Sequence, residues 1–370
     1  MSTEKLQYEP VDKTKVRSWV WTPAAAAVNS KSLHGIAPPQ RKLRFGDVVL
    51  VQVKEPGYHA EVETINRIRS RATFAVAHLF VGTTFLAVVG ARYAEEEFHG
   101  LVPKHARRNL QLLNAGGVVG EVVSANSFCT APTTVRVMGV LVDQEGQVVN
   151  TRTQVKAKTV TKSSSPNHKL IVVCGSGMDS GKTNAGKAVI YSLNAAGHPV
   201  AAGKVTGTAR FQDLTLLNQA GAWAIDHFAY HGFPSTYTLK KSELEELFWQ
   251  VYHYLARELD AQLEGRENPQ PGFIVLELAD GLLQEETQFL LTNEGIRPCV
   301  DRVVLACRDA LGVLAGMTLL NEWGLPSPVI SGRVSNADLG RQQLLRQMGG
   351  EVNVFDSMHI DQRHIRRIVA

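Results

Sequence analysis

The residues best suited to chemistry lie between positions 175 and 184, where a glycine-rich segment ends in Gly-Lys-Thr. Glycines let backbone N–H groups approach phosphate oxygens closely. In this pattern the Lys182 ammonium would bridge the β- and γ-phosphates of a nucleotide, and the Thr183 hydroxyl would bind Mg²⁺. The predicted phosphate site consists of Gly175, Ser176, Gly177, Met178, Asp179, Ser180, Gly181, Lys182, Thr183 and Asn184.

Such a loop must join a buried strand to the first turn of a helix, where unpaired N–H groups and a partial positive charge face the ligand. Residues 170–174 form an apolar run that ends at a glycine, which predicts a buried parallel strand. Residues after Thr183 have helical spacing. A chance Gly-Lys-Thr in a loop is the alternative, and the flanking strand and helix disfavour it.

Two further predicted strands end in charged residues. Lys204 interrupts the apolar strand 199–205 before a Thr/Gly-rich turn, and Glu277 ends the apolar run 273–276. The carboxyl ends of parallel strands face the ligand, and a carboxylate that is costly to bury unpaired favours a metal or its water as partner. The predicted metal ligands are Thr183, Glu277 and Asp226, with Asp213 and Asp280 as alternatives to Asp226.

Other polar residues near these strands have two possible roles. His227, Tyr230 and His231 could form a metal site, but their aromatic neighbours favour histidines that pack in the core. Arg210 could help to hold a phosphate. Earlier in the chain, Arg92, Tyr93 and the acidic residues 95–97 could line a site, although charge runs are usually solvated loops.

Composition excludes several classes of protein. The chain has 370 residues, of which 44% are hydrophobic and 20% charged, so we expect a folded globular protein with room for two domains. A net charge of +4 does not argue for nucleic-acid binding, and a solvated helix end explains the basic residues 363–367 equally well. Apolar runs are too short to span a membrane, and the polar N-terminus lacks a signal core. Scattered cysteines at 129, 174, 299 and 307 indicate reduced thiols and a cytoplasmic protein.

The hydrophobic pattern changes along the chain and predicts four regions. These are an N-terminal arm (1–44), a β-rich domain (45–154), a polar linker (155–168) and a P-loop domain (169–370). Short strands at 47–53, 60–65, 73–80, 84–90, 118–123, 134–142 and 148–151 predict a small barrel or sandwich. Glycines at 116, 117 and 120 allow another part of the backbone to approach closely.

After the linker, strands alternate with helices. Strands are predicted at 170–174, 199–205, 272–278, 302–307, 328–332 and 352–355, and helices at 242–262, 310–323 and 337–348. Ser242 and Glu245 form the expected capping box of the first of these helices. The predicted fold class is therefore α/β, with a mostly parallel sheet flanked by helices and preceded by a β-rich barrel- or sandwich-like domain.

The loop and the two strand ends together resemble dethiobiotin synthetase and MobB-like P-loop ATPases of the SIMIBI type. The first glycine, Gly175, gives the spacing G-x5-G-K-T, because Ser176 stands where the usual loop has its glycine. Asp179 stands where the synthetases carry a glutamate, while Gly177 replaces their other acidic residue. Thr206-Gly207-Thr208, residues 226–228 and Glu277 also resemble an uncharacterised two-domain family with a synthetase-like second half. The resemblance covers about residues 170–356 and not the β-rich domain.

This resemblance implies an enzyme that uses ATP and Mg²⁺. Lys182 and Lys204 would neutralise the transferred phosphoryl group, and Lys204 would also bind the substrate carboxylate. Asp179 would orient or deprotonate a small acceptor such as a carboxylate or carbamate, in a ligase- or kinase-like reaction. Glu277 would hold Mg²⁺, and Asn336, after the strand 328–332, would contact the base. A homodimer is expected as well. The alternative is a nucleotide switch or assembly ATPase whose β-rich domain binds a protein partner.

Overall fold

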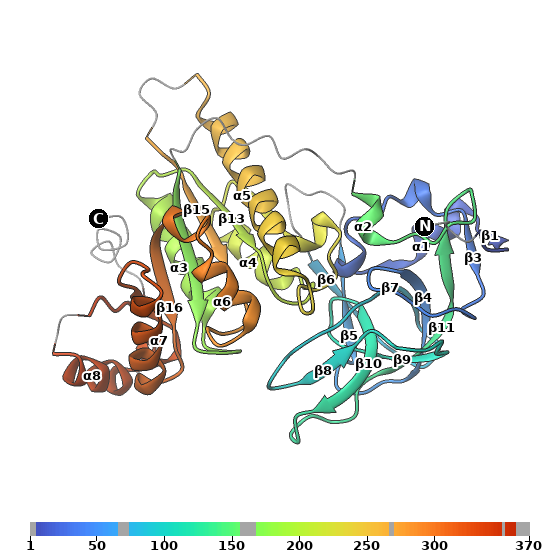
Figure 1. Cartoon of the computed structure of the whole chain (residues 1–370), viewed down its shortest axis with the longest axis horizontal. Coiled ribbons are helices and arrows are strands. Elements are labelled where there is room, and N and C mark those ends of the chain that lie inside the picture. The colour runs from blue at the N-terminus through green and yellow to red at the C-terminus, as the bar shows by residue number, and fades with distance from the viewer. Residues whose placement is uncertain (1–4, 66–73, 156–167, 266–269, 350–351, 360–370) are drawn as a thin grey trace.

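The computed structural model describes residues 5–65, 74–155, 168–265, 270–349 and 352–359. Its C-terminal part is an α/β unit and its N-terminal part is rich in β-strands (Figure 1), which confirms the predicted fold class. Most of the predicted linker and the basic residues 363–367 lie outside the described residues. The four domain boundaries stay a prediction.

The C-terminal sheet is parallel throughout, in the order β14-β13-β15-β12-β16-β17. Its strands are nearly continuous apolar runs because helices cover both faces. The register places Lys204 directly beside Glu277, so the two charged strand ends meet. The strand bounds are β12 Lys169–Gly175, β13 Val200–Lys204, β14 Ala224–His227, β15 Phe273–Glu277, β16 Val300–Ala306 and β17 Val329–Ser331. The strand predicted at 352–355 is reduced to a single bridge between Ile330 and Val354.

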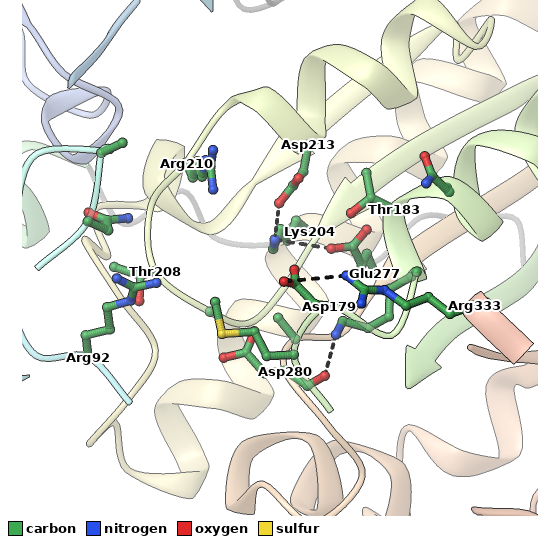
Figure 2. A pocket seen from close by; sticks show the side chains of 18 of the residues that line it. Arg92, Asp179, Thr183, Lys204, Thr208, Arg210, Asp213, Glu277, Asp280 and Arg333 are labelled. Carbon is green, nitrogen blue, oxygen red and sulfur yellow. Dashed lines mark hydrogen bonds and ion pairs between the residues drawn. The ribbon is translucent and has the colours of Figure 1, made fainter. Parts of the chain in front are cut away.

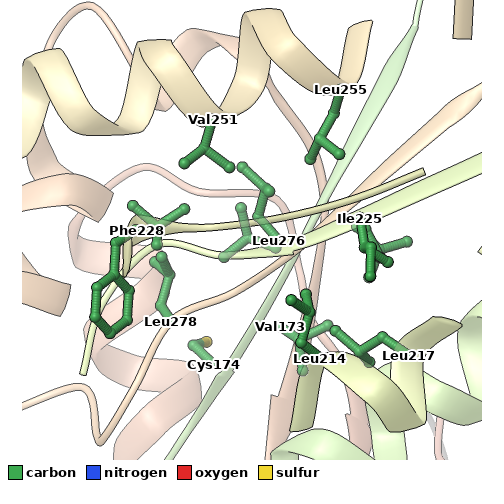
Figure 3. Close-up of a cluster of buried hydrophobic side chains, with 14 of the residues drawn as sticks. Val173, Cys174, Leu214, Leu217, Ile225, Phe228, Val251, Leu255, Leu276 and Leu278 are labelled. Atoms are coloured by element: carbon green, nitrogen blue, oxygen red, sulfur yellow. The ribbon is translucent and has the colours of Figure 1, made fainter. Parts of the chain in front are cut away.

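Helices pack on both faces of this sheet. Figure 3 shows Val251 and Leu255 of one helix on one side of the strands, and Leu214 and Leu217 of another on the opposite side. All four side chains are buried in the core. The helix bounds are α3 Lys182–Ala195, α4 Gln212–Gln219, α5 Lys241–Leu263, α6 Glu285–Thr292, α7 Ala310–Glu322 and α8 Asp338–Gln347.

The capping box predicted at Ser242 and Glu245 is wrong by two residues. Helix α5 begins at Lys241, so its third residue is Glu243. The Lys240 N–H donates to Glu243 Oε2 at 3.0 Å, which satisfies an N–H at the start of the helix. The apolar stripe predicted for this helix is buried as expected, including Leu244, Leu247 and Leu259.

The N-terminal strands form a closed barrel. Strand β11 pairs with β4, β4 with β7, β7 with β10, β10 with β9, and β9 again with β11. Side chains at alternate positions, such as Val49, Val51 and Val53, fill the interior with Phe85 and Val137. The bounds are β4 Val48–Glu55, β7 Thr84–Val89, β9 Asn109–Leu112, β10 Val118–Ala125 and β11 Thr134–Val142.

Shorter strands add to the barrel. Residues of the predicted arm form β1 Glu9–Pro10, β2 Val20–Trp21 and β3 Gly35–Ala37, which pair with each other or with β7 and β11. Strand β8, Phe98–Leu101, pairs with β10, whereas β5, Glu61–Ile65, and β6, Phe74–His78, form a separate pair. The strand predicted at 148–151 is wrong: Val148 makes one bridge with Val142, and helix α2, Thr151–Gln154, follows.

Candidate functional site

The glycine-rich loop has the strand–loop–helix geometry predicted for it. Strand β12 ends at Gly175 and helix α3 begins at Lys182, whose preceding residue Gly181 has a left-handed φ of 100°. A Cβ atom on Gly175 would lie 2.3 Å from Ser180 Oγ, so the turn requires glycine there. Asp179 also has a positive φ, 54°. The loop therefore turns back sharply onto the N-terminus of α3, where free N–H groups favour an anion.

Lys182 is buried at the base of this loop. Its Nζ donates to the backbone oxygen of Gly177 at 2.8 Å and to that of Asp280. Burial lowers the pKa of Lys182, while the nearby Asp280 and Glu277 charges oppose that effect. Two backbone oxygens thus hold the ammonium by hydrogen bonds that a phosphate could replace. The ammonium lies where the lysine of a phosphate-binding loop contacts the phosphates.

Lys204 and two carboxylates form an ion-pair cluster beside the loop. Lys204 Nζ lies 2.5 Å from Asp213 Oδ2 and 3.2 Å from Glu277 Oε1, and Figure 2 shows the ammonium between them. Burial alone would lower the pKa of Lys204, but the charges of Asp213 and Glu277 outweigh it and raise the pKa above its usual value. Lys204 in turn lowers the pKa of Asp213, against the opposing effect of burial. Lys204 and Asp213 therefore stay charged at neutral pH.

Glu277 retains one unused acceptor. The residue is 2% exposed, and its Oε2 is buried without a hydrogen-bond partner among the residues that the structure describes. A buried carboxylate oxygen without a partner is costly, and an oxygen-preferring divalent cation or its bound water would relieve that cost. The donor set therefore fits Mg²⁺, with Thr183 lining the same cavity.

The cavity at the carboxyl ends of these strands has a volume of about 380 Å³ and is walled by both parts of the chain (Figure 2). From the predicted site it includes Met178, Asp179, Gly181, Lys182, Thr183, Asn184, Lys204, Glu277 and Asn336. Gly175, Ser176, Gly177 and Ser180 are not among its lining residues and instead shape the turn beneath it. Asp179 lies at the rim, where its carboxylate is 3.8 Å from Arg333 Nη2.

Asp226 does not lie in this cavity, contrary to its predicted metal role. Its side chain is fully buried, with Oδ2 2.7 Å from His231 Nε2 and Oδ1 accepting from the His227 N–H at 2.9 Å. Asp213, which the sequence offered only as an alternative, occupies the place beside Glu277. The first residues of α4 bring it there, and that short helix was not predicted.

The histidine cluster packs in the core, as its aromatic neighbours predicted. His227 Nδ1 accepts from the Ala229 N–H at 3.1 Å, and its ring contacts Phe211 and Phe228. Burial, together with the nearby Lys204 charge, lowers the pKa of His227 to about 3. Within the described residues, no group of three His, Cys, Asp or Glu side chains has the arrangement of a metal site.

Asn336 and Arg210 both line the cavity but are held by protein groups. Ser357 Oγ lies 3.1 Å from the side-chain amide of Asn336. When this amide is rotated so that its nitrogen and oxygen change places, the nitrogen also donates to Asp356 and to the Gly332 backbone oxygen. Arg210 Nε donates to Glu63 Oε1 at 3.0 Å, which connects the loop after β13 to strand β5. Its predicted phosphate role therefore competes with a role in joining the two parts of the chain.

Several contacts fix the β-rich part against the loop after β13. The Phe211 N–H donates to Glu63 Oε2 at 2.6 Å, and Asn114 Nδ2 donates to the Ala209 backbone oxygen at 2.7 Å. A Cβ atom on Gly116 would lie only 1.5 Å from that same oxygen, so the close approach predicted for this glycine occurs between the two parts.

Apart from Arg92, which the sequence offered as a residue that could line a site, the wall that the β-rich part contributes was not predicted. His59, Arg92, Asn114 and Ala115 line the cavity opposite the loop. Arg92 and Glu97, favoured as part of a solvated loop, instead form a buried ion pair at 2.6 Å. The signal in the sequence was the run of acidic residues 95–97 close to Arg92. Whether these side chains face solvent or the cavity depends on how the two parts of the chain pack together.

The similarity of this chain to known proteins is confined to solved structures. No protein-family model and no curated protein sequence matches the chain. Solved structures with similarity include the signal recognition particle receptor FtsY from Elizabethkingia anophelis, at 14% identity and a TM-score of 0.36, over 53% of this chain and 59% of that one. The signal recognition particle 54 kDa protein from Aeropyrum pernix K1, solved in complex with GDP, gives 14% identity and a TM-score of 0.35 over 58% of this chain and 48% of that one.

This chain therefore spans about half to three fifths of the length of those proteins. At such TM-scores the similarity carries no functional inference, and the P-loop-like character of the C-terminal part rests on its own strand–loop–helix geometry. None of the helices in the described ranges is both long enough and apolar enough to cross a membrane.

Proposed function

We propose that this chain binds Mg²⁺·ATP at the loop 175–184 and transfers the γ-phosphoryl group to a small acceptor, in a ligase- or kinase-like reaction. The observation that carries the proposal is the cluster at the loop's mouth. Two buried ammonium groups, Lys182 and Lys204, lie beside a buried carboxylate, Glu277, that has an unpartnered oxygen. A buried carboxylate oxygen without a partner is uncommon in folded proteins and favours a ligand or a water molecule beside it.

Each residue has a role that follows from its position. Lys182 and the N–H groups at the start of α3 would bind the β- and γ-phosphates, and Lys204 would neutralise charge on the transferred group. Glu277, Thr183 and Asp213 would hold Mg²⁺, directly or through water. When bound, this ion would neutralise the phosphate oxygens. Asp213 replaces Asp226 in this assignment because only Asp213 lies beside Glu277.

The shared cavity favours an enzyme over a nucleotide switch. An acceptor needs a space next to the γ-phosphate, and this cavity, walled by both parts of the chain, provides one. Asp179 lines the same space and is the proposed group that orients or deprotonates the acceptor. The three most exposed large apolar side chains of the β-rich part, Phe80, Val81 and Phe128, lie at turns and not on the face of a strand.

Calorimetric titration with a Mg²⁺ complex of a non-hydrolysable ATP analogue tests the nucleotide site. We expect Lys182→Ala to weaken binding by at least 100-fold, because it removes a buried charge that contacts phosphate. Lys187→Ala is the matched control: this lysine is on the same helix and does not line the cavity. Equal affinity of the wild type and Lys182→Ala for the analogue would overturn the loop assignment.

An ADP-release assay without added acceptor then separates the two functions. Binding with almost no turnover is expected for an enzyme that lacks its second substrate. Steady hydrolysis, or hydrolysis stimulated by a protein fraction, would instead support the switch whose β-rich domain binds a partner. The same titration with a GTP analogue decides between the two bases, and light scattering after size-exclusion chromatography tests the proposed homodimer.

A further inference from the structure

The β-rich part places a buried arginine on the wall of the cavity that faces the glycine-rich loop. Arg92 is 8% exposed and lines the cavity together with His59 and Asn114. In Figure 2 its guanidinium extends from the β-rich wall into the cavity, in the direction of Thr208. Charged side chains usually lie in solvent at the surface. An arginine that is buried on the wall of a cavity therefore needs another explanation.

One corner of the guanidinium is fixed by protein groups. Arg92 Nη1 donates to Glu97 Oε2 at 2.6 Å and to the Leu113 backbone oxygen, and it lies 3.3 Å from His59 Nε2. Burial would raise the pKa of Glu97, but His59 and Arg92 lower it to about 2, so the carboxylate stays ionised. These contacts orient the guanidinium, and the Glu97 carboxylate balances its single positive charge.

The remaining edge of the guanidinium is unused. Within the described ranges, no hydrogen bond is formed by Arg92 Nε or Nη2, although the side chain is more than nine-tenths buried. These two nitrogens form the planar fork that matches the two oxygens of a carboxylate. An arginine held at one corner with its fork free is an arrangement typical of ligand binding.

The opposite wall leaves room for such a ligand next to the phosphate site. Thr208 and Arg210, from the loop after β13, line the same cavity as Lys182 and Lys204. The Asn114 amide, by contrast, already donates to the Ala209 backbone oxygen and accepts from the Val118 N–H. Arg92 therefore supplies two unused donors on the β-rich wall, and Thr208, which lines the same cavity, adds a hydroxyl.

We infer that the Arg92 edge is the subsite for the acceptor, and that the acceptor is a small molecule bearing a carboxylate. This inference rests on the proposed phosphoryl transfer. Binding by Arg92 would anchor the acceptor at one end, so that its reacting group faces the γ-phosphate between Lys182 and Lys204. A carboxylate suits this position because its two oxygens match the two parallel donors, Nε and Nη2, on the free edge of Arg92.

The test is calorimetric titration of the full chain with malonate, in the presence of saturating Mg²⁺ and a non-hydrolysable ATP analogue. Arg92→Lys keeps the positive charge and a donor for Glu97 and Leu113, and removes the planar fork. We expect it to weaken malonate binding at least tenfold while the affinity for the nucleotide analogue changes less than twofold. Arg107→Lys is the matched control, since Arg107 forms an exposed pair with Glu121 in the same part of the chain.

Three outcomes would count against the inference. Malonate affinity that is equal in the wild type and Arg92→Lys, or absent in both, overturns the subsite. Inorganic phosphate that binds more tightly than malonate and depends on Arg92 overturns the carboxylate class. Failure of the wild type to bind the nucleotide analogue overturns the proposed function. In that case, titration of malonate alone decides whether the Arg92 subsite exists without it, and a circular-dichroism melt verifies that the variants are folded.

Discussion

At the scale of single residues, the unpartnered oxygen of Glu277 gives the sharpest prediction. Glu277→Gln keeps the size of the side chain and removes the negative charge that would attract Mg²⁺. We expect the gain in affinity for the ATP analogue that Mg²⁺ provides to be largely lost in the variant, with binding of the analogue in the absence of metal nearly unchanged. Calorimetric titration with the analogue across a Mg²⁺ series checks this. An unchanged Mg²⁺ dependence in the variant would transfer the metal role to Asp213 or Asp280.

The buried His227 gives a prediction about pH. Its pKa is lowered to about 3 in the folded chain, mainly by burial, so between that value and about 6.5 the unfolded chain binds a proton that the folded chain does not. Its contribution to stability is therefore complete above pH 6.5 and is lost as the pH falls, by up to about 1.4 kcal/mol per pH unit.

His227→Asn removes the titrating group and can keep an acceptor for the Ala229 N–H. Urea unfolding of both proteins between pH 7 and 5 measures the difference. The wild type should lose more stability than the variant over this range. Parallel losses would show that other groups cause the acid sensitivity.

Residue chemistry was the most predictable level. The loop and the two strand ends, Lys204 and Glu277, could be recognised because charged residues at the ends of apolar strands have few structural uses. Asp213 and Asp226 are both carboxylates in one segment. Local sequence does not show which of them faces the ligand. The deciding fact is the short helix α4, whose eight residues make only about two turns and therefore give little pattern to recognise.

At the scale of elements, the loop after β13 is held between the sheet and the barrel. A methyl group at position 116 would collide with the Ala209 backbone oxygen, so Gly116→Ala should displace this loop and the attached Asp213. We expect clearly weaker binding of the Mg²⁺·ATP analogue while the barrel stays folded. Calorimetry and circular dichroism, measured on the same preparation, check both halves of this statement.

Gly186→Ala is the control, since a Cβ there would make ordinary contacts with Leu217 at 3.5 Å and Val173 at 3.7 Å. This helix-interior position should gain up to about 1 kcal/mol of stability from the substitution. Unchanged affinity of Gly116→Ala for the analogue would mean that the loop tolerates a shift of the barrel.

Element prediction succeeded where segments were long and failed where they were short. Strands β4 and β11 and helix α5 were located because each carries many residues of one period. Strands β8, β9 and β14 have four residues each and were missed. Their pairing depends on partners far away in the sequence, which a local pattern does not contain.

At the scale of the whole molecule, the two parts act as one unit around the cavity. Glu63 and Arg210 are joined across 147 positions of sequence, and such a contact could not be predicted from either segment alone. Barrel closure is of the same kind, because it requires β9 to pair with both β10 and β11. The sequence could indicate a barrel or sandwich, but not how that barrel faces the P-loop.

Hydrogen exchange on the whole chain tests this unity. Binding of the Mg²⁺·nucleotide analogue should slow exchange in the glycine-rich loop, and also in residues 57–63 and 90–100 of the β-rich part. Strands β1 and β3, which lie at the edge of the β-rich part away from the C-terminal sheet in Figure 1, serve as an internal reference and should not change. Protection confined to the C-terminal part would show that the barrel does not respond to the nucleotide.

The position of Lys204 also has a consequence for the order of events. Its ammonium already lies between Asp213 and Glu277, so one of their two negative charges is balanced before any ligand arrives. A divalent ion that binds alone would have to displace the Lys204 ammonium from these carboxylates. It brings no anion with which the displaced ammonium could pair. A nucleotide brings both the ion and the phosphate oxygens that can receive the lysine. We therefore expect the ion to enter together with the nucleotide, and calorimetry with MgCl₂ alone to show no binding.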